Sequence, residues 1–390
     1  MASVYFDYMA STPIAPEVRQ AMHDCLSNKD WANSSSSYHM FGATAEAIIH
    51  ESSLQLSSLI KCNSQDIVWL SGATEANNLA IKGVAQFYGK SRRHIITMAT
   101  EHASVLDSCK FLESLGFEVT YLKPQANGLL DLNILKQAMR PDTVLVSIMM
   151  VNNETGIIQD IQKISSIVKA SGALLHVDAA QAIGRVEIDL ASYHVDLMTF
   201  SSHKAYGPMG VGALYVNSNP RVRLTPQIHG GGHQLGLRSG SLPVHQIVGM
   251  STACALVNES LAADIIRVTA LRDKLWCGLS SLGDVYLNGD LNHQIPHCLN
   301  VRFSGVHQES LLLSMRPFAL ATGSACNSVL STPSHVLQAM GLTLTEASNS
   351  IRISLGRETS DDDVDNLLRN LQQEVVRLRR MSPCDGVISR

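Results

Sequence analysis

Lysine is rarely buried, yet one lysine of this sequence directly follows an apolar run. In TFSSHKAYGPMGVGALYV, Lys204 comes after DLMTFS (196–201) and before a turn rich in glycine and proline. A partly desolvated lysine is a neutral nucleophile that can form a Schiff base with a carbonyl compound. The alternative is a loop lysine whose amine reaches solvent, which is the commoner case for a single lysine. The stretch lacks G-x-x-x-x-G-K-[ST], so it is not a P-loop.

A carboxylate and an amide follow a second apolar run. In LLHVDAAQAIG, Asp178 closes the run and Gln181 comes three residues later. Polar groups at the carboxyl ends of strands lie at the edge where open α/β sheets bind ligands. If Lys204 holds pyridoxal phosphate, the ring nitrogen of the cofactor needs such a carboxylate to stay protonated. The alternative is an aspartate that caps the following helix.

Two further strand ends offer an anion site and an imidazole. In WLSGATEANNLAIKG, Gly72, Ala73 and Thr74 open a helix, whose free N–H groups and dipole favour a phosphate. Many strand-to-helix turns look the same, so this pattern is weak alone. In TMATEHASVLDS, His102 lies at a helix start. A neutral imidazole there suits stacking on a ring and proton exchange, and a capping or packing histidine is the alternative.

A glycine-rich loop, QIHGGGHQLGLRSGSLP, carries polar side chains of two kinds. Its histidines, His229 and His233, could suggest a metal. There is no H-E-x-x-H motif and no carboxylate nearby, so no metal is expected. Arg238 and Ser241 suit contact with an anion or a subunit interface instead.

Seven short apolar or β-branched runs alternate with helical patterns, which predicts an α/β sheet with helices on both faces. Thr74, His102, Asp178 and Lys204 follow different strands and would converge at the carboxyl edge of this sheet. The run before VNNETG adds Asn153 at a further strand end. The predicted strands are DIVWLS (66–71), HIITMA (94–99), EVTYL (118–122), TVLVSIM (143–149), ALLHVDA (173–179), DLMTFS (196–201) and GALYV (212–216).

The regular alternation of strand and helix patterns ends at about residue 255, where a long helical stretch begins. A strand-like HCLNVRFSG follows, and a final helix is predicted over Asp361–Met381. A chain of 390 residues exceeds what one hydrophobic core usually supports. We therefore predict a large domain over 15–255 and a smaller α+β domain formed by 1–14 and 256–390.

Composition points to a globular protein of the cytoplasm. Hydrophobic residues make up 45% of the chain and charged residues 16%, unlike a disordered protein. The net charge of −4 gives no electrostatic reason to expect nucleic acid. No apolar run has the length of a membrane span, and the N-terminus does not resemble a signal peptide. The eight cysteines include no C-x-x-C pair, as expected for reduced thiols.

One cysteine stands among turn-forming residues instead of apolar ones. In ATGSACNSVLSTPSHVL (321–337), Cys326 is flanked by glycine, serine and asparagine. By itself this pattern predicts an accessible thiol on a loop that can move.

With these motifs in order along nearly the whole chain, the sequence resembles the cysteine desulfurases of the iron–sulfur-cluster type. That family consists of class V, fold-type I pyridoxal-phosphate enzymes. The resemblance implies a fold-type I transferase with a mainly parallel seven-stranded sheet and a smaller α+β domain. The motifs that show it are SGATEANNLAIKG, TEHASVLDS, VNNETG, HVDAAQAIG, SSHKAYGP, HGGGHQLGLRSGSLPVHQIVGM and GSACNS…PSHVL.

The resemblance also implies roles for individual side chains. Lys204 would bind pyridoxal 5'-phosphate covalently, Asp178 would pair with its ring nitrogen and Gln181 with its hydroxyl, and His102 would stack on the ring and shuttle a proton. Asn153 and Arg352 would bind the substrate amino acid, and Cys326 would receive its sulfur. The residues implied for the phosphate are Ala73, Thr74, Ser201, His203 and, from the second subunit of a homodimer, Ser241.

The implied reaction converts L-cysteine to L-alanine and leaves a persulfide on Cys326 for a sulfur-acceptor protein, either an iron–sulfur scaffold or a thiolation relay. No direct contact with nucleic acid or membrane is expected. A selenocysteine lyase shares most of the site and is the alternative. An aminotransferase has no use for the loop thiol. A degenerate paralogue that only binds partners would have no need of Lys204, Asp178, His102 and Cys326 together.

Overall fold

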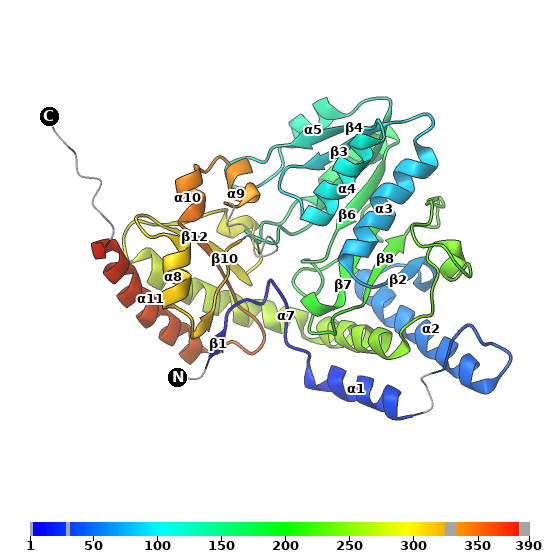
Figure 1. The fold of residues 1–390 in the computed structure, drawn as a ribbon, viewed down its shortest axis with the longest axis horizontal. Helices are drawn as coiled ribbons and strands as arrows, with labels where there is room; N and C mark the ends of the chain where they lie inside the picture. Colours follow the sequence, from blue (N-terminus) through cyan, green and yellow to red (C-terminus); the bar gives the residue numbers. More distant parts are fainter. Residues whose placement is uncertain (1–2, 29–31, 324–332, 382–390) are drawn as a thin grey trace.

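All seven predicted strands form one sheet in the computed structural model, which describes residues 3–28, 32–323 and 333–381. The strand order is β2-β8-β7-β6-β5-β3-β4. β8 is antiparallel to β7 and β2, and the other neighbours pair in parallel (Figure 1). The strands are β2 (Ile67–Leu70), β3 (His94–Met98), β4 (Glu118–Leu122), β5 (Thr143–Met149), β6 (Leu174–Asp178), β7 (Leu197–Ser201) and β8 (Gly212–Val216).

Helices cover both faces of this sheet because the central strands are apolar on both sides. α3 (Ala73–Tyr88) and α4 (Ala103–Ser114) pack on one face. The other face shares one core with α6 and with helical residues of α2 and α7. The sequence of α6 explains both its packing and its end. Ile161, Ile164 and Val168 lie on one buried side, and Gly172 ends the helix with a φ of 73°. The helices on this side are α2 (Met40–Ile60), α5 (Leu132–Ala138), α6 (Ile161–Ser171) and α7 (Val244–Ser280).

A second, smaller core forms around an antiparallel sheet of order β12-β10-β9. The predicted final helix is confirmed as α11 (Asp361–Met381), and its apolar side, spaced by three or four residues, faces this core. The remaining elements here are β9 (Val285–Leu287), β10 (Cys298–Phe303), β12 (Ser350–Ser354), α8 (Gln308–Ser314), α9 (His335–Ala339), α10 (Leu344–Ser348) and the parallel pair β1 (Val4–Tyr5) and β11 (Phe318–Ala319).

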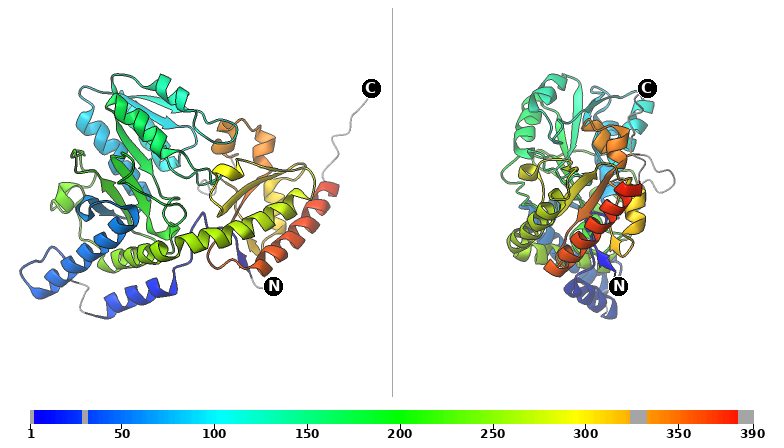
Figure 2. Two further views of the ribbon diagram at one scale, coloured as in Figure 1. Left: turned by 180° about the vertical axis from the view of Figure 1, so that it is seen from behind. Right: turned by 90° about the vertical axis from the view of Figure 1, so that its left-hand side faces the viewer.

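One helix joins the two cores. α7 is 37 residues long; its first half packs in the core of the large sheet and its second half in the smaller core (Figure 2). α1 (Pro16–Ser27) packs along the same helix. The predicted boundary at residue 255 therefore falls inside a continuous helix. The N-terminal strand β1 pairs with β11 of the smaller part, and the division into domains stays a prediction.

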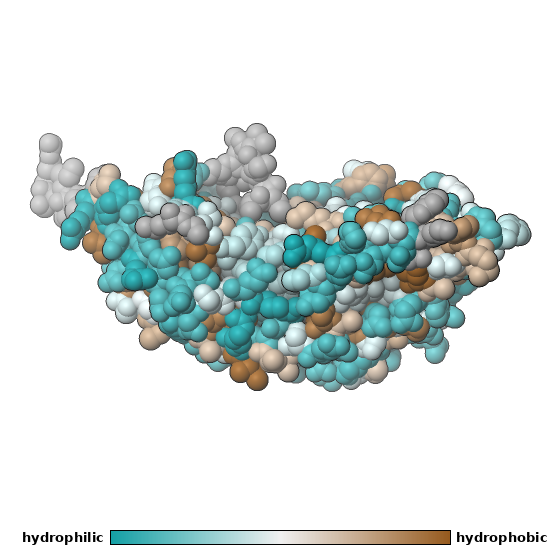
Figure 3. All heavy atoms as spheres, turned by 90° about the horizontal axis from the view of Figure 1, so that it is seen from below, coloured by the Kyte–Doolittle hydropathy of each residue, from teal (hydrophilic) through white to brown (hydrophobic). Residues whose placement is uncertain are grey.

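The surface is mixed in character. The face seen from below is largely hydrophilic, with apolar side chains in small separate patches (Figure 3). Among the described residues, no helix combines the length and the apolar character that crossing a bilayer requires.

Candidate active site

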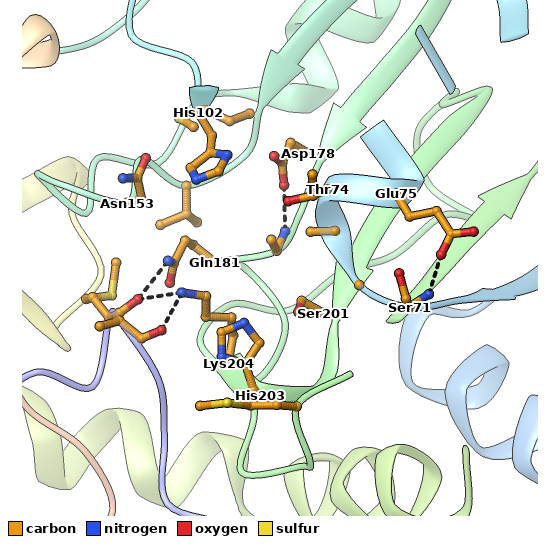
Figure 4. Close-up of a pocket in the computed structure, with 18 of the residues that line it drawn as sticks. Ser71, Thr74, Glu75, His102, Asn153, Asp178, Gln181, Ser201, His203 and Lys204 are labelled. Carbon is orange, nitrogen blue, oxygen red and sulfur yellow. Dashed lines mark hydrogen bonds between the residues drawn. The ribbon is translucent and has the colours of Figure 1, made fainter. Parts of the chain in front are cut away.

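A cavity of about 540 Å³ lies at the carboxyl edge of the large sheet, where the sequence predicted convergence (Figure 4). Arg352 reaches it from β12 of the smaller sheet. Ser241 lines a separate hollow of about 170 Å³, which shares Ser71 and Gly210 with the cavity. Cys326 lies outside the described residues. The predicted residues that line the cavity are Ala73, Thr74, His102, Asn153, Asp178, Gln181, Ser201, His203, Lys204 and Arg352.

The lysine is presented by a single 3₁₀ turn, Ser202–Lys204, that follows β7. Its Nζ donates hydrogen bonds to the carbonyl oxygens of Met9, at 2.8 Å, and Ala10, at 2.7 Å. Both carbonyls belong to the N-terminal segment, which sequence reasoning did not connect with this site. The amine is thereby held at the wall of the cavity (Figure 4).

The carboxylate of Asp178 is held by two donors and is 5% exposed. Its Oδ1 accepts the backbone N–H of Ala180 at 2.9 Å, and its Oδ2 accepts Nδ2 of Asn77 at 2.8 Å. The alternative interpretation expected this aspartate to cap a helix, whereas a turn follows it. Two charge-assisted hydrogen bonds fix the carboxylate where β6 ends.

The start of α3 faces the cavity without a side-chain cap, because its N-cap residue is Gly72. Strand β8 lies close: a Cβ placed on Gly212 would be 2.7 Å from Gly72 Cα. Beside it, Nε of Arg238 donates to Glu75 at 2.9 Å. Burial tends to raise the pKa of Glu75, but the hydrogen bonds from Arg238 and Ser71 hold that pKa below its usual value. The uncapped N–H groups and the helix dipole make this end suited to a phosphate.

His102 caps α4, as the alternative interpretation expected, and it also lines the cavity. Its Nδ1 accepts the backbone N–H of Ser104 at 3.2 Å and lies 2.9 Å from Ser104 Oγ. One edge of the ring is therefore engaged by the helix that it caps.

A buried arginine that sequence reasoning missed lies behind the cavity. Arg185 Nη1 donates to Gln181 Oε1 at 2.5 Å, and Gln181 Nε2 donates to the carbonyl of Met9 at 3.0 Å. Burial lowers the pKa of Arg185 to about 10, so this guanidinium remains charged at neutral pH. Burial, together with the charges of Lys204 and Arg185, lowers the pKa of His203 to about 4, so its imidazole is neutral.

The second arginine of the site, Arg352, is 3% exposed and held from two sides. Its Nη1 donates to the carbonyl of Asn153 and its Nη2 to Asp7 Oδ1, both at 2.7 Å. The Nε of Arg352 and the Oδ1 of Asn153 have no hydrogen-bond partner among the described residues. Buried polar groups of this kind usually have partners, so this pair is suited to an amino-acid ligand.

The residues on either side of segment 324–332 meet at Glu154. Ser334 Oγ hydrogen-bonds to Glu154 Oε2. A Cβ on Gly323 would lie 2.2 Å from the same carboxylate oxygen. Burial raises the pKa of Glu154, against the opposing effects of Ser334 and nearby positive charges. Glu154 follows Asn153 directly, so the flanks of the segment contact the turn after β5 whose Asn153 carbonyl accepts a hydrogen bond from Arg352.

Comparison with known proteins identifies this arrangement. The family model described as Aminotransferase class-V matches residues 4–367. A protein of Methylococcus capsulatus named Cysteine desulfurase IscS is 50% identical over 380 residues, covering 97% of this chain and 94% of that protein. This chain belongs to the cysteine desulfurases, within the class-V aminotransferases. The solved structure of a NifS-like protein has a TM-score of 0.89 at 34% identity, covering 96% of this chain and 99% of that one. SspA in complex with cysteine has a TM-score of 0.82 at 36% identity, covering 91% and 99%.

Class-V aminotransferases depend on pyridoxal phosphate, and the cavity of this cysteine desulfurase fits that group. An amine, a fixed carboxylate and a ring that can stack line one space, and an uncapped helix start suits the phosphate. The close approach of the two backbones leaves no room for a side chain on Gly212 beside that start. The donor set is therefore that of a carbonyl cofactor with a phosphate tail.

Asn77 of this cysteine desulfurase was not singled out in the sequence, although the sequence pattern around it indicates a buried polar residue. Asn77 stands on the apolar side of α3, three, four and seven residues before Ala80, Ile81 and Val84. A polar residue on an apolar stripe must find partners inside the protein. By contrast, the carbonyls of Met9 and Ala10 follow no side-chain pattern.

Proposed function

We propose that this protein removes the sulfur atom from L-cysteine and places it on Cys326. The β-carbon–sulfur bond of the substrate breaks, and a sulfur–sulfur bond forms on the thiol. The products are L-alanine and a Cys326 persulfide, so cysteine plus thiol balances alanine plus persulfide. The observation that supports this most directly is the shared cavity of Lys204, Asp178, His102 and Arg352 in a chain about half identical to a cysteine desulfurase.

Each side chain has a part in this proposal. Lys204 would hold pyridoxal phosphate and Asp178 would face its ring nitrogen. When bound, the cofactor supplies an electron sink that lets bonds at the substrate's α- and β-carbons break. Arg352 would bind the substrate carboxylate, with Asn153 beside it. His102 would move a proton at the ring edge that does not cap α4. Gln181 would contact the ring hydroxyl of the cofactor. The phosphate would be held by Ala73, Thr74, Ser201 and His203.

The test of the transfer step is Cys326→Ala. We expect the variant to bind cysteine and change the visible absorption of the bound cofactor, but to form no persulfide and release no sulfide under a reductant. Alanine and persulfide should be followed together in the wild type, one for one. Normal sulfide release by the variant would contradict the role of Cys326.

We also propose a homodimer in which each subunit completes the phosphate site of the other. Ser241 carries a hydroxyl, yet it lines a hollow beside the cavity instead of the cavity itself. A second chain could bring this residue to the phosphate. The proposal includes a sulfur-acceptor protein, an iron–sulfur scaffold or a thiolation relay, and a location in the cytoplasm.

Mixed dimers test the shared site. Chains with Lys204→Ala and chains with Ser241→Ala should each lose activity as pure dimers. Refolded together, they would form a mixed dimer in which one site has both the lysine and the serine hydroxyl. We expect activity to return in the mixture in proportion to mixed dimers, measured as alanine formed. Serine and lysine acting within one chain would give no recovery.

A further inference from the structure

A fully buried asparagine outside the cavity connects two of its residues. Asn77 lies on α3 and is 0% exposed. Its Nδ2 donates to Asp178 Oδ2 at 2.8 Å and to Ser104 Oγ at 2.9 Å. Ser104 Oγ in turn lies 2.9 Å from His102 Nδ1. An unbroken series of hydrogen bonds thus runs from the carboxylate to the imidazole.

The direction of each hydrogen bond in this series follows from elementary chemistry. An ionised carboxylate only accepts, so the amide group of Asn77 must turn its nitrogen toward Asp178. The second hydrogen of the same nitrogen then points to Ser104 Oγ, which must accept it. Accepting from Asn77 leaves the proton of the Ser104 hydroxyl available to donate to His102 Nδ1. The orientation of the amide is therefore fixed by its neighbours.

His102 receives two donors on the same nitrogen. Besides the Ser104 hydroxyl, the backbone N–H of Ser104 donates to Nδ1 at 3.2 Å. A proton on Nδ1 would face the backbone N–H, which can only donate, so that hydrogen bond would be lost, and the Ser104 hydroxyl would have to accept instead of donate. A neutral imidazole has one N–H, which must then be on Nε2. The ring consequently presents a donor, not an acceptor, at the edge that does not cap α4.

We propose that Asn77 is a positioning residue that sets the proton of His102 on Nε2. It does so by directing the Ser104 hydroxyl toward Nδ1, and it orients the Asp178 carboxylate with the same nitrogen. The catalytic consequence rests on the proposed function, in which His102 moves a proton. The tautomer itself does not depend on that function and can be measured without turnover.

The experiment is nitrogen NMR of the protein loaded with pyridoxal phosphate, with ¹⁵N-labelled histidine and no substrate. Signals of His102 are assigned by their loss in His102→Gln. In the wild type we expect one neutral tautomer with its proton on Nε2. In Asn77→Ala and in Ser104→Ala a second population with the proton on Nδ1 should appear. Ser104→Thr keeps the hydroxyl and should retain the wild-type tautomer.

A matched control separates the change of the His102 tautomer from a general loss of structure caused by removing a buried asparagine. Asn288 is another buried asparagine, whose Nδ2 donates to Asn300 Oδ1 at 2.8 Å and Ser350 Oγ at 2.9 Å, and it does not line the cavity. Asn288→Ala should leave the His102 signals unchanged. For Asn77→Ala we expect kcat for alanine formation to fall by up to about 100-fold with KM changed less than about twofold.

Clear results would overturn the proposal. One is a wild-type His102 with its proton on Nδ1. Another is an unchanged tautomer in both Asn77→Ala and Ser104→Ala, which would show that the helix cap alone sets it. A third is the same change in Asn288→Ala. A wild-type protein with the expected tautomer but no desulfurase activity would refute the proposed function and leave this assignment standing.

Discussion

At the scale of single residues, the site depends on side chains that are restrained before any ligand arrives. Arg352 is held by Asp7 and by the carbonyl of Asn153, so little conformational entropy would be lost in the proposed binding of the substrate carboxylate. Asp178 is restrained in the same way by Asn77 and Ala180. Restraint of this kind places charge where the reaction needs it.

Arg352→Lys tests the substrate contact. A lysine has one ammonium group and cannot offer the planar pair of donors that suits a carboxylate. We expect KM for cysteine to rise about tenfold or more, which corresponds to about 1.4 kcal/mol, with a smaller change in kcat. Steady-state alanine formation measures both constants. An unchanged KM would show that the carboxylate is bound elsewhere.

At the scale of elements, strand β8 and the start of α3 approach each other closely beside the proposed phosphate site. On Gly212 of β8, a Cβ would lie 2.5 Å from the carbonyl oxygen of Phe200 and 2.7 Å from Gly72 Cα. These are backbone atoms, so no side-chain rotation could relieve the contact. The absence of a side chain at this position lets β8 lie against the start of α3 and the end of β7.

Gly212→Ala should therefore push the start of α3 away from the end of β7. We expect affinity for pyridoxal phosphate to fall about tenfold or more, and overpacking to cost about 1–3 kcal/mol of stability. Cofactor titration and urea unfolding measure the two effects. Gly42→Ala is the matched control, because its Cβ would lie 2.1 Å from the carbonyl oxygen of Ser36, away from the cavity. Equal loss of cofactor affinity in both variants would contradict this account.

At the scale of the whole molecule, α7 contributes residues to both cores. Buried histidines make the free energy of unfolding depend on pH. His176 is 0% exposed, with Nδ1 2.8 Å from Ser147 Oγ and Nε2 3.0 Å from Thr199 Oγ1. Burial lowers its pKa to about 4, with partial opposition from the charge of Asp178. The unfolded chain would titrate near a pKa of about 6.5. The stability from this neutral histidine is therefore present above pH 6.5 and lost as pH falls toward 4.

His176→Gln should flatten the pH dependence of stability. Lowering the pH from 7.5 to 5 should cost the wild type about 2 kcal/mol through this one group, and the variant should lack that part. Urea midpoints of the cofactor-loaded protein at both pH values give the comparison. His23→Gln is the control, since its side chain is 73% exposed. Parallel pH profiles for wild type and His176→Gln would contradict the assignment.

The sequence by itself determined the elements. Seven apolar runs of strand length became the seven strands, because a strand covered on both faces must be apolar on both sides. The amphipathic spacing of Asp361–Met381 likewise gave α11. The positions of Thr74, His102, Asp178 and Lys204 at strand ends predicted their meeting, because parallel strands end at one edge. The alternation of strand and helix patterns ends near residue 255, but no helix ends there. At that point α7 passes from the core of the large sheet to the smaller core.

Only the tertiary structure decided which groups hold these side chains. Lys204 donates to a carbonyl 195 residues away in sequence, Arg352 to a carboxylate 345 residues away, and Asn77 to Asp178 across 101 residues. Local propensity and hydrophobic period describe neighbours along the chain, so they do not encode contacts of this separation. Folding brings the N-terminal segment against the edge of the sheet, and that placement determines where the charges and protons of the site lie.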